Sequence, residues 1–278
     1  MLAAGITPEQ TTTVFNANAS SSVKRNLSAI VLNRQFTPEV RTRATEAVYQ
    51  YMCTNARSID RGNFSNLCSS DLGLLFQIND EYFFEGEVAK LCERTAHRPL
   101  SFRLSTRMTS AGGMTTMQTS KIRRKRQVDF EIAIATTPLF ASFRDEENAI
   151  VSGINCNDRL EALQRIMEHE MVHLIEMLLW TDSNCSANPF KNIVRRFFGH
   201  TESKHQLLTP RDLAKKKLGI SPGDKVQFHA DGLIVQGHVN RITKRATVLV
   251  PHARGQRYDD GKKYKKYYVP LNRLRRAS

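Results

Sequence analysis

The sequence predicts an α+β fold made of a larger mixed domain followed by a small all-β domain. Residues 157–180 carry apolar side chains three and four positions apart, begin with Asn-Asp and contain no glycine or proline, which is the pattern of an amphipathic helix. Residues 226–269 instead contain short alternating apolar segments separated by Asp-Gly turns, which indicates antiparallel strands. The chain has 278 residues, 40% of them hydrophobic, enough for one good-sized domain and a small second one.

The first part of the chain reads mainly as helix. Residues 1–24 are polar and poor in large apolar groups, so we expect them to be disordered. Thr37-Pro38 is a helix start, because a capping threonine precedes proline at the first helical position. A second helical region is expected over residues 71–94. The chain as a whole is expected to divide into a main domain at 25–208, a linker at 209–221 and a small domain at 222–278.

Strand patterns follow the helical region. Phe102 and Leu104 alternate with polar residues, and Gly112-Gly113 marks a turn from which a second strand can return. The basic run at 121–126 is expected to cap an exposed hairpin, and residues 130–134 alternate as a half-buried strand. After the amphipathic helix, a shorter helix is expected over residues 189–198, closed by a glycine cap.

The C-terminal region combines a short helix with several strands. Thr209-Pro210 opens a helix that ends at Gly219. Four or five short strands in about 55 residues then predict a small SH3-like barrel. Residues 211–278 hold 17 of the 41 Lys and Arg residues but only 5 of the 27 Asp and Glu residues. This asymmetry favours a polyanionic partner, most simply nucleic acid; the alternative is a basic surface that only aids solubility.

Cysteine usage and hydropathy indicate a cytoplasmic protein. The five cysteines are scattered, are odd in number and form no C-x-x-C pair, as expected for reduced thiols. The most apolar run, Leu174–Trp180, contains Glu176 and is too short to span a membrane. The N-terminus has neither the basic nor the apolar region of a secretory signal. We therefore expect a cytoplasmic location without membrane association, with contact to the nucleoid through the basic domain.

The amphipathic helix carries the motif His169-Glu170-Met171-Val172-His173. At 100° per residue, His169 and His173 lie one turn apart on the same face, so both can bind one zinc ion. Glu170 is then placed to deprotonate water at the metal as a general base. The alternative is an amphipathic core helix in which these polar side chains have no function. Burying them without a partner such as a metal ion would cost free energy.

Two further segments precede this motif in the order of a known family. They are Phe76–Gly86 (FQINDEYFFEG) and Leu104–Gly113 (LSTRMTSAGG). With the histidine motif, they resemble the SprT-like (Spartan-related) zinc metalloprotease domain over roughly residues 38–208. The resemblance implies a zincin-like α+β fold, zinc-dependent peptidase activity on DNA-associated proteins, and a sheet edge beside the active-site helix to which a substrate strand can add.

The chain departs from this family at two points. Members usually carry a His-Gly pair a dozen or so residues after the second histidine, where this chain reads Asn184–Phe190 (NCSANPF) without a histidine. The zinc-ribbon tail of some members is also missing, and the basic barrel takes its place. The third metal ligand is therefore an open question in the sequence.

We choose His200 as the third ligand, because an antiparallel following helix could bring it back beside the metal pair. Glu176 shares the histidine face but lies about 10.5 Å along the axis from His169, so we expect it to orient a ligand. Cys185 ranks low, because a thiolate would make water at the zinc less acidic. His205 matches a histidine of relatives that already have three ligands, so we expect it to be structural or to face the substrate. A site without a third protein ligand, completed by water, ranks directly after His200.

The expected function is that of a zinc metalloendopeptidase and DNA-repair hydrolase. His169, His173 and His200 would bind zinc, Glu170 would be the catalytic base, and the basic barrel would bring the enzyme to nucleic acid, with protein crosslinked to DNA as substrate. The rival function is a nucleic-acid-binding protein whose zincin domain is catalytically silent and structural. The cleavage preference, the choice between DNA and RNA and the oligomeric state are not encoded in any recognisable pattern.

Overall fold

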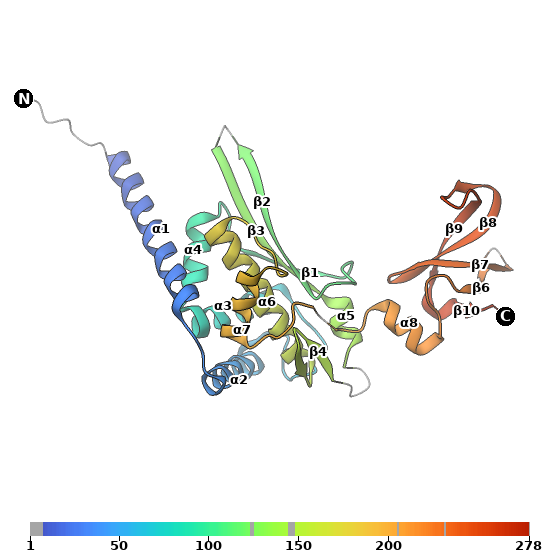
Figure 1. Ribbon diagram of the computed structural model, residues 1–278, viewed down its shortest axis with the longest axis horizontal. Coiled ribbons are helices and arrows are strands. Elements are labelled where there is room, and N and C mark those ends of the chain that lie inside the picture. Colours follow the sequence, from blue (N-terminus) through green and yellow to red (C-terminus); the bar gives the residue numbers. More distant parts are fainter. Residues whose placement is uncertain (1–7, 123–124, 144–147, 205, 231, 278) are drawn as a thin grey trace, which may run out of the picture.

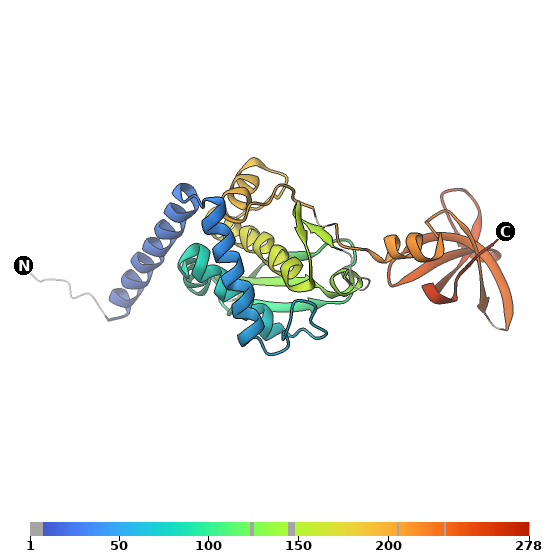
Figure 2. The same ribbon diagram turned by 90° about the horizontal axis from the view of Figure 1, so that it is seen from below.

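The computed structural model is a mixed α+β structure with small sheets (Figure 1), as the sequence predicts. It describes residues 8–122, 125–143, 148–204, 206–230 and 232–277, with side chains from Ser21 onward except Ile122 and Lys125. Figure 2 shows the first helix and the C-terminal sheet at opposite ends of the molecule, with the main domain between them. In the described part of the chain, no helix is long and apolar enough to cross a membrane.

The N-terminal segment is helical, where the sequence predicted disorder up to residue 24. Helix α1 spans Pro8–Asn33. Its C-terminal half buries Val23, Leu27 and Val31, which are four residues apart and therefore share one face. This apolar stripe accounts for the docking of α1, and the missed helix is a correction to the predicted disorder.

Helix α2, Pro38–Asn55, begins as predicted, with Thr37 as its cap. The single helical region expected next is two helices, α3 (Ser69–Phe84) and α4 (Glu87–Thr95), because Glu85 and Gly86 both adopt positive φ angles. The N-cap residue of α4 is Gly86, which has no side chain to cap the helix, and Asp80 on α3 caps it instead. Its carboxylate accepts hydrogen bonds from the backbone N–H groups of Val88 and Ala89 at 3.1 and 2.8 Å.

The first sheet has the strand order β1-β3-β2. Its strands are β1 (Ser101–Ser105), β2 (Gly113–Ile122) and β3 (Lys125–Ala135). β3 is central, parallel to β1 and antiparallel to β2, so β1 and β2 do not pair with each other across the Gly112-Gly113 turn. In the described residues β2 is thus an edge strand, and the expected basic hairpin joins β2 to β3, although its tip at 123–124 lies outside the described residues.

Helix α6, Arg159–Trp180, runs through the centre of the main domain. Asp158 caps it by accepting a hydrogen bond from the backbone N–H of Glu161 at 2.9 Å, so the predicted start is confirmed. Most of its residues are buried, and it packs on β2 and β3. Around it lie α5 (Thr136–Ala141), the hairpin β4 (Ala149–Val151) and β5 (Ile154–Cys156), and α7 (Asn188–Phe198), which Gly199 closes as predicted.

The C-terminal region forms a five-stranded antiparallel sheet in the order β10-β6-β7-β8-β9. Its strands are β6 (Lys225–Ala230), β7 (Leu233–Ile242), β8 (Arg245–Arg257), β9 (Lys263–Pro270) and β10 (Arg275–Arg276), with a short 3-10 helix at Leu271–Arg273. Helix α8, Pro210–Leu218, lies within the expected linker. It contributes Ala214 to the buried cluster of this sheet, which is separate from the main core.

Candidate metal centre

The two motif histidines face each other on α6. Their Nε2 atoms are 3.2 Å apart, and His169 is almost fully buried while His173 is partly buried. Two imidazoles bound to one tetrahedral zinc at 2.0–2.1 Å would hold these atoms about 3.3 Å apart. The i, i+4 spacing therefore produces, in this helix, the separation that a shared metal ion requires.

Cys185 is the group that completes a cluster with the histidines. One ligand atom each from His169, His173 and Cys185 lies within 4.8 Å of the others. The chain reaches this position because Thr181, at the C-terminal end of α6, adopts a left-handed conformation with φ of 64° and turns the following loop back along the helix. Cys185 was a low-ranked alternative in the sequence, because a thiolate would make water at the zinc less acidic.

His200 is not brought to the pair, and its expected role as third ligand is corrected. Its imidazole is buried with Nε2 2.9 Å from Oε2 of Glu168. Glu168 is also bound by the guanidinium of Arg165 at 2.8 Å, so the three side chains form a buried polar network. Although α7 does return beside α6, its end meets the neighbouring face of the helix. His205, the other histidine considered, lies outside the described residues.

Glu176 orients a histidine through one intervening hydroxyl. The hydroxyl of Ser183 donates a hydrogen bond to Oε2 of Glu176 at 2.6 Å, and the same hydroxyl oxygen lies 2.6 Å from Nδ1 of His173. Because the serine proton points to the carboxylate, the serine oxygen accepts the Nδ1–H of His173. The Nε2 lone pair of His173 then faces His169, which is the tautomer a metal ligand needs. Glu176 therefore lies where the sequence placed it, behind a ligand.

Glu170 is buried against the first residues of β2. Its Oε2 accepts a hydrogen bond from the hydroxyl of Thr115 at 2.8 Å, and the same hydroxyl is 2.9 Å from the Glu170 carbonyl oxygen. Burial raises the pKa of Glu170 to about 7, against the opposing effect of the hydrogen bonds from Thr115. A carboxyl group with a pKa near neutrality is suited to accept and return a proton.

The donor set fits a zinc ion. Two imidazole nitrogens and one thiolate are ligands that zinc prefers, and three protein ligands leave a fourth position for water or substrate. Burial lowers the pKa of His173 to about 4, which keeps its imidazole neutral and able to bind a metal. Cys185 is partly buried and reduced, with no disulfide partner among the described residues.

The cluster opens into a cleft of about 550 Å³. One wall is the start of β2, the floor is α6, and the far wall is the segment after α7. The lining residues that carry chemistry are Gly113, Thr115, His169, Glu170, His173, Ser183, Cys185, Ser203 and Lys204. Of these, Thr115, Ser183, Ser203 and Lys204 were not identified from the sequence, since they come from separate elements that only the fold brings together.

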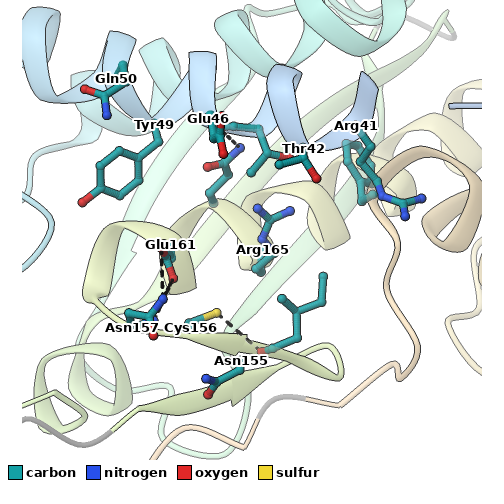
Figure 3. Close-up of a pocket in the computed structure, with 14 residues that line it drawn as sticks. Arg41, Thr42, Glu46, Tyr49, Gln50, Asn155, Cys156, Asn157, Glu161 and Arg165 are labelled. Carbon is teal, nitrogen blue, oxygen red and sulfur yellow. Dashed lines mark hydrogen bonds between the residues drawn. The ribbon is translucent and has the colours of Figure 1, made fainter. Parts of the chain in front are cut away.

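A second cavity, of about 620 Å³, lies between α2, β5 and the N-terminal half of α6 (Figure 3). Arg165 and Glu161 on α6 line it, together with Arg41 and Tyr49 on α2. None of the cluster residues lines this cavity. It is therefore a different feature from the metal cleft.

No family model, curated protein or solved structure matches this chain.

Proposed function

We propose that this protein is a zinc-dependent metallopeptidase that acts on proteins bound or crosslinked to DNA. The observation that carries the proposal is the convergence of His169, His173 and Cys185 around one point, with the Glu170 carboxylate buried in the same cleft. A structural metal site has no need of an adjacent carboxylate, whereas hydrolysis needs a base.

The side chains divide the chemistry between them. Zinc bound here would supply a Lewis acid that polarises a peptide carbonyl and acidifies water. Glu170 accepts the proton from the attacking water and delivers it to the leaving amine. Thr115 holds one oxygen of Glu170 in place, and the Ser183–Glu176 pair holds the His173 ring. The SprT-like resemblance supports the same division of roles.

The free edge of β2 supports a polypeptide substrate. In the described sheet, β2 pairs with β3 on one side only, and its first residues, Gly113 to Thr115, line the cleft. An extended peptide can add to such an edge through backbone hydrogen bonds, which select a strand conformation without selecting a sequence. A peptide bound along β2 would pass directly over Glu170.

The outer face of the C-terminal sheet supports a nucleic-acid partner. Strand register places Lys225, His238, Leu249 and Lys266 in one row across four strands. Arg241, Thr247 and the 64% exposed Tyr268 form the next row, and strands β6–β10 contain no acidic residue. Cations and an exposed aromatic ring on one face fit phosphates and unstacked bases. A small SH3-like barrel remains our proposal for this domain.

A groove of about 660 Å³ connects this sheet to the main domain. Arg211 and Lys215 of α8 and Arg241 of β7 line it, and Ser110 at its far side also lines the metal cleft. Nucleic acid on the sheet would therefore lie close to a protein held in the cleft. This continuity favours a substrate in which protein and nucleic acid are joined.

The test uses purified, zinc-supplied full-length protein. We expect about one zinc per chain. We also expect the protein to cleave a basic protein bound to DNA, and we expect DNA to stimulate this cleavage. Glu170→Gln should keep the zinc and lose the cleavage, because it removes the base and no ligand. A wild-type protein that carries no zinc, or a Glu170→Gln variant with more than a few per cent of wild-type activity, would contradict the proposal.

The rival is a nucleic-acid-binding protein with a structural zinc site. The thiolate of Cys185 favours it, because an anionic ligand beside the two neutral imidazoles makes water at the metal less acidic. In that case the protein would bind both zinc and DNA, and neither wild type nor Glu170→Gln would cleave the substrate.

A further inference from the structure

A basic pocket of about 410 Å³ lies next to the metal cleft, between α7 and the segment after it. Ser203 and Lys204 line both the pocket and the cleft. The two spaces are therefore neighbours that share part of one wall.

The pocket is rich in cations. Lys191 and Arg195 are four residues apart on the exposed face of α7, so their side chains project together. Lys204 contributes a third cation and Glu202 the single carboxylate. Within the described chain, none of these three cations forms an ion pair with a carboxylate, so their charges are available to a ligand.

The backbone of the pocket wall is fixed. The amide N–H of Ser152 donates to the carbonyl of Lys204 at 3.1 Å, and the N–H groups of Thr201 and Glu202 both donate to the carbonyl of Ser152. The floor is made by Val194 and His200, which are buried. The hairpin of β4 and β5 thus holds the segment in a defined position beside the cleft, as a specificity pocket requires.

We propose that this pocket is a substrate subsite that selects an acidic side chain, Asp or Glu, close to the scissile peptide bond. The inference rests on the proposed peptidase function and adds a sequence preference to it. A carboxylate entering the pocket would meet three cations against the one carboxylate of Glu202. A nucleic-acid phosphate is the less favoured occupant, because among the described residues the one aromatic ring that lines the pocket is the buried imidazole of His200, which is not exposed to stack a base.

The test measures peptide binding rather than cleavage. Glu170→Gln, which leaves the cleft intact, is titrated by fluorescence anisotropy with a labelled peptide containing one glutamate and with its glutamine counterpart. We expect the glutamate peptide to bind about tenfold more tightly at low salt, as two or three solvent-screened ion pairs would provide. The preference should shrink as salt rises.

Two charge-reversal pairs give the control. Adding Lys191→Glu and Arg195→Glu to the Glu170→Gln background should abolish or invert the preference. Arg43→Glu with Arg94→Glu makes the same change in net charge at exposed positions of α2 and α4, and should leave the preference unchanged. Circular dichroism of each variant establishes that the fold is kept.

Three results would overturn the subsite. They are equal binding of the two peptides, equal effects of the two charge-reversal pairs, or a Lys191/Arg195 effect on binding of a single-stranded oligonucleotide with none on the peptide preference. Failure of the peptidase function is distinguishable, because it appears as missing zinc or missing cleavage in wild type, whereas the peptide preference is read in a variant that does not cleave.

Discussion

Gly113 lies so close to Glu170 that a Cβ atom at this position would be 2.7 Å from both Cγ and Oε1 of the carboxylate side chain. Such contacts are shorter than van der Waals packing allows. The edge strand and the candidate base are therefore fitted to each other, and the glycine is required by the proximity of Glu170 rather than by its own backbone conformation.

Gly113→Ala should consequently displace Glu170 and lower kcat by about a hundredfold, since a shift of about 1 Å at a reacting group costs this much. The zinc content should stay near wild type, because no ligand changes. Gly73→Ala is the matched control, as its Cβ would lie 3.6 Å from the Phe102 ring, in ordinary contact. Equal kinetics for the two variants would show that Glu170 does not depend on the space at Gly113.

Cys185→Ser should weaken zinc binding, whereas His200→Ala should leave the zinc stoichiometry unchanged. Cys185 is within the cluster, and His200 is bound to Glu168 instead. The His200 variant should lower the free energy of unfolding by about 1–3 kcal/mol, because it leaves the buried Glu168 with one partner fewer. Metal analysis after dialysis against a chelator, together with urea unfolding, separates the two effects. Zinc loss from His200→Ala alone would reverse the assignment.

The start and end signals of individual helices could be predicted from the sequence, because they are local. Thr37, Asp158 and Gly199 all act at the predicted boundaries. The third member of the cluster could not be predicted, because Cys185 reaches the histidines only through the reversal of the chain at Thr181.

The pairing of the strands could not be predicted from the sequence for a similar reason. Each of the segments flanking Gly112-Gly113 pairs with β3 rather than with the other, in one case in parallel. Which strand becomes central depends on how α6 covers the sheet, and no short window of sequence contains that information. The motif residues themselves could be predicted because their spacing matches the period of one helix.

Ser183→Ala should reduce zinc affinity about ten- to a hundredfold, the usual effect of removing a group that orients a metal ligand. It breaks the link between Glu176 and His173 without touching any ligand atom. Ser186→Ala, in the same exposed loop, is the control. A competitive titration with a zinc-binding dye gives the affinities, and identical values for the two variants would remove the orienting role.

Asp80 should make the stability of the protein fall between about pH 4 and pH 6. Burial raises the pKa of this carboxyl group from 3.8 to about 6, in spite of two backbone hydrogen bonds. Since the folded pKa is above the unfolded one, the stabilisation is fully present below pH 4 and is lost as pH rises through 6, by about 3 kcal/mol in total. The Asp80→Asn variant has no carboxyl group to titrate at this position. Its free energy of unfolding, relative to that of wild type, should therefore rise by about 3 kcal/mol from pH 4 to pH 7. If urea unfolding gave the same pH dependence of the free energy of unfolding for wild type and Asp80→Asn, Asp80 would not be the origin of the pH effect.

The last expectation concerns which cations of the C-terminal sheet bind nucleic acid. Lys225, Arg241, Lys266 and Arg275 lie on strands whose register places them on the outer face. Lys262 lies in the turn between β8 and β9, and Lys263 is the first residue of β9. Changing the first four to glutamate in the full-length protein should abolish most binding to single-stranded DNA.

If each of the four contacts one phosphate, their loss should flatten the slope of log K against log salt by about 3, since each contact on a single strand contributes about 0.7. Reversing Lys262 and Lys263 should change the slope by less than half of this. A salt titration by anisotropy, beginning at about 50 mM, measures both. A larger effect from the turn lysines would place the nucleic acid on the β8–β9 hairpin instead of the sheet face, and no measurable binding of wild type would exclude the DNA-linked substrate.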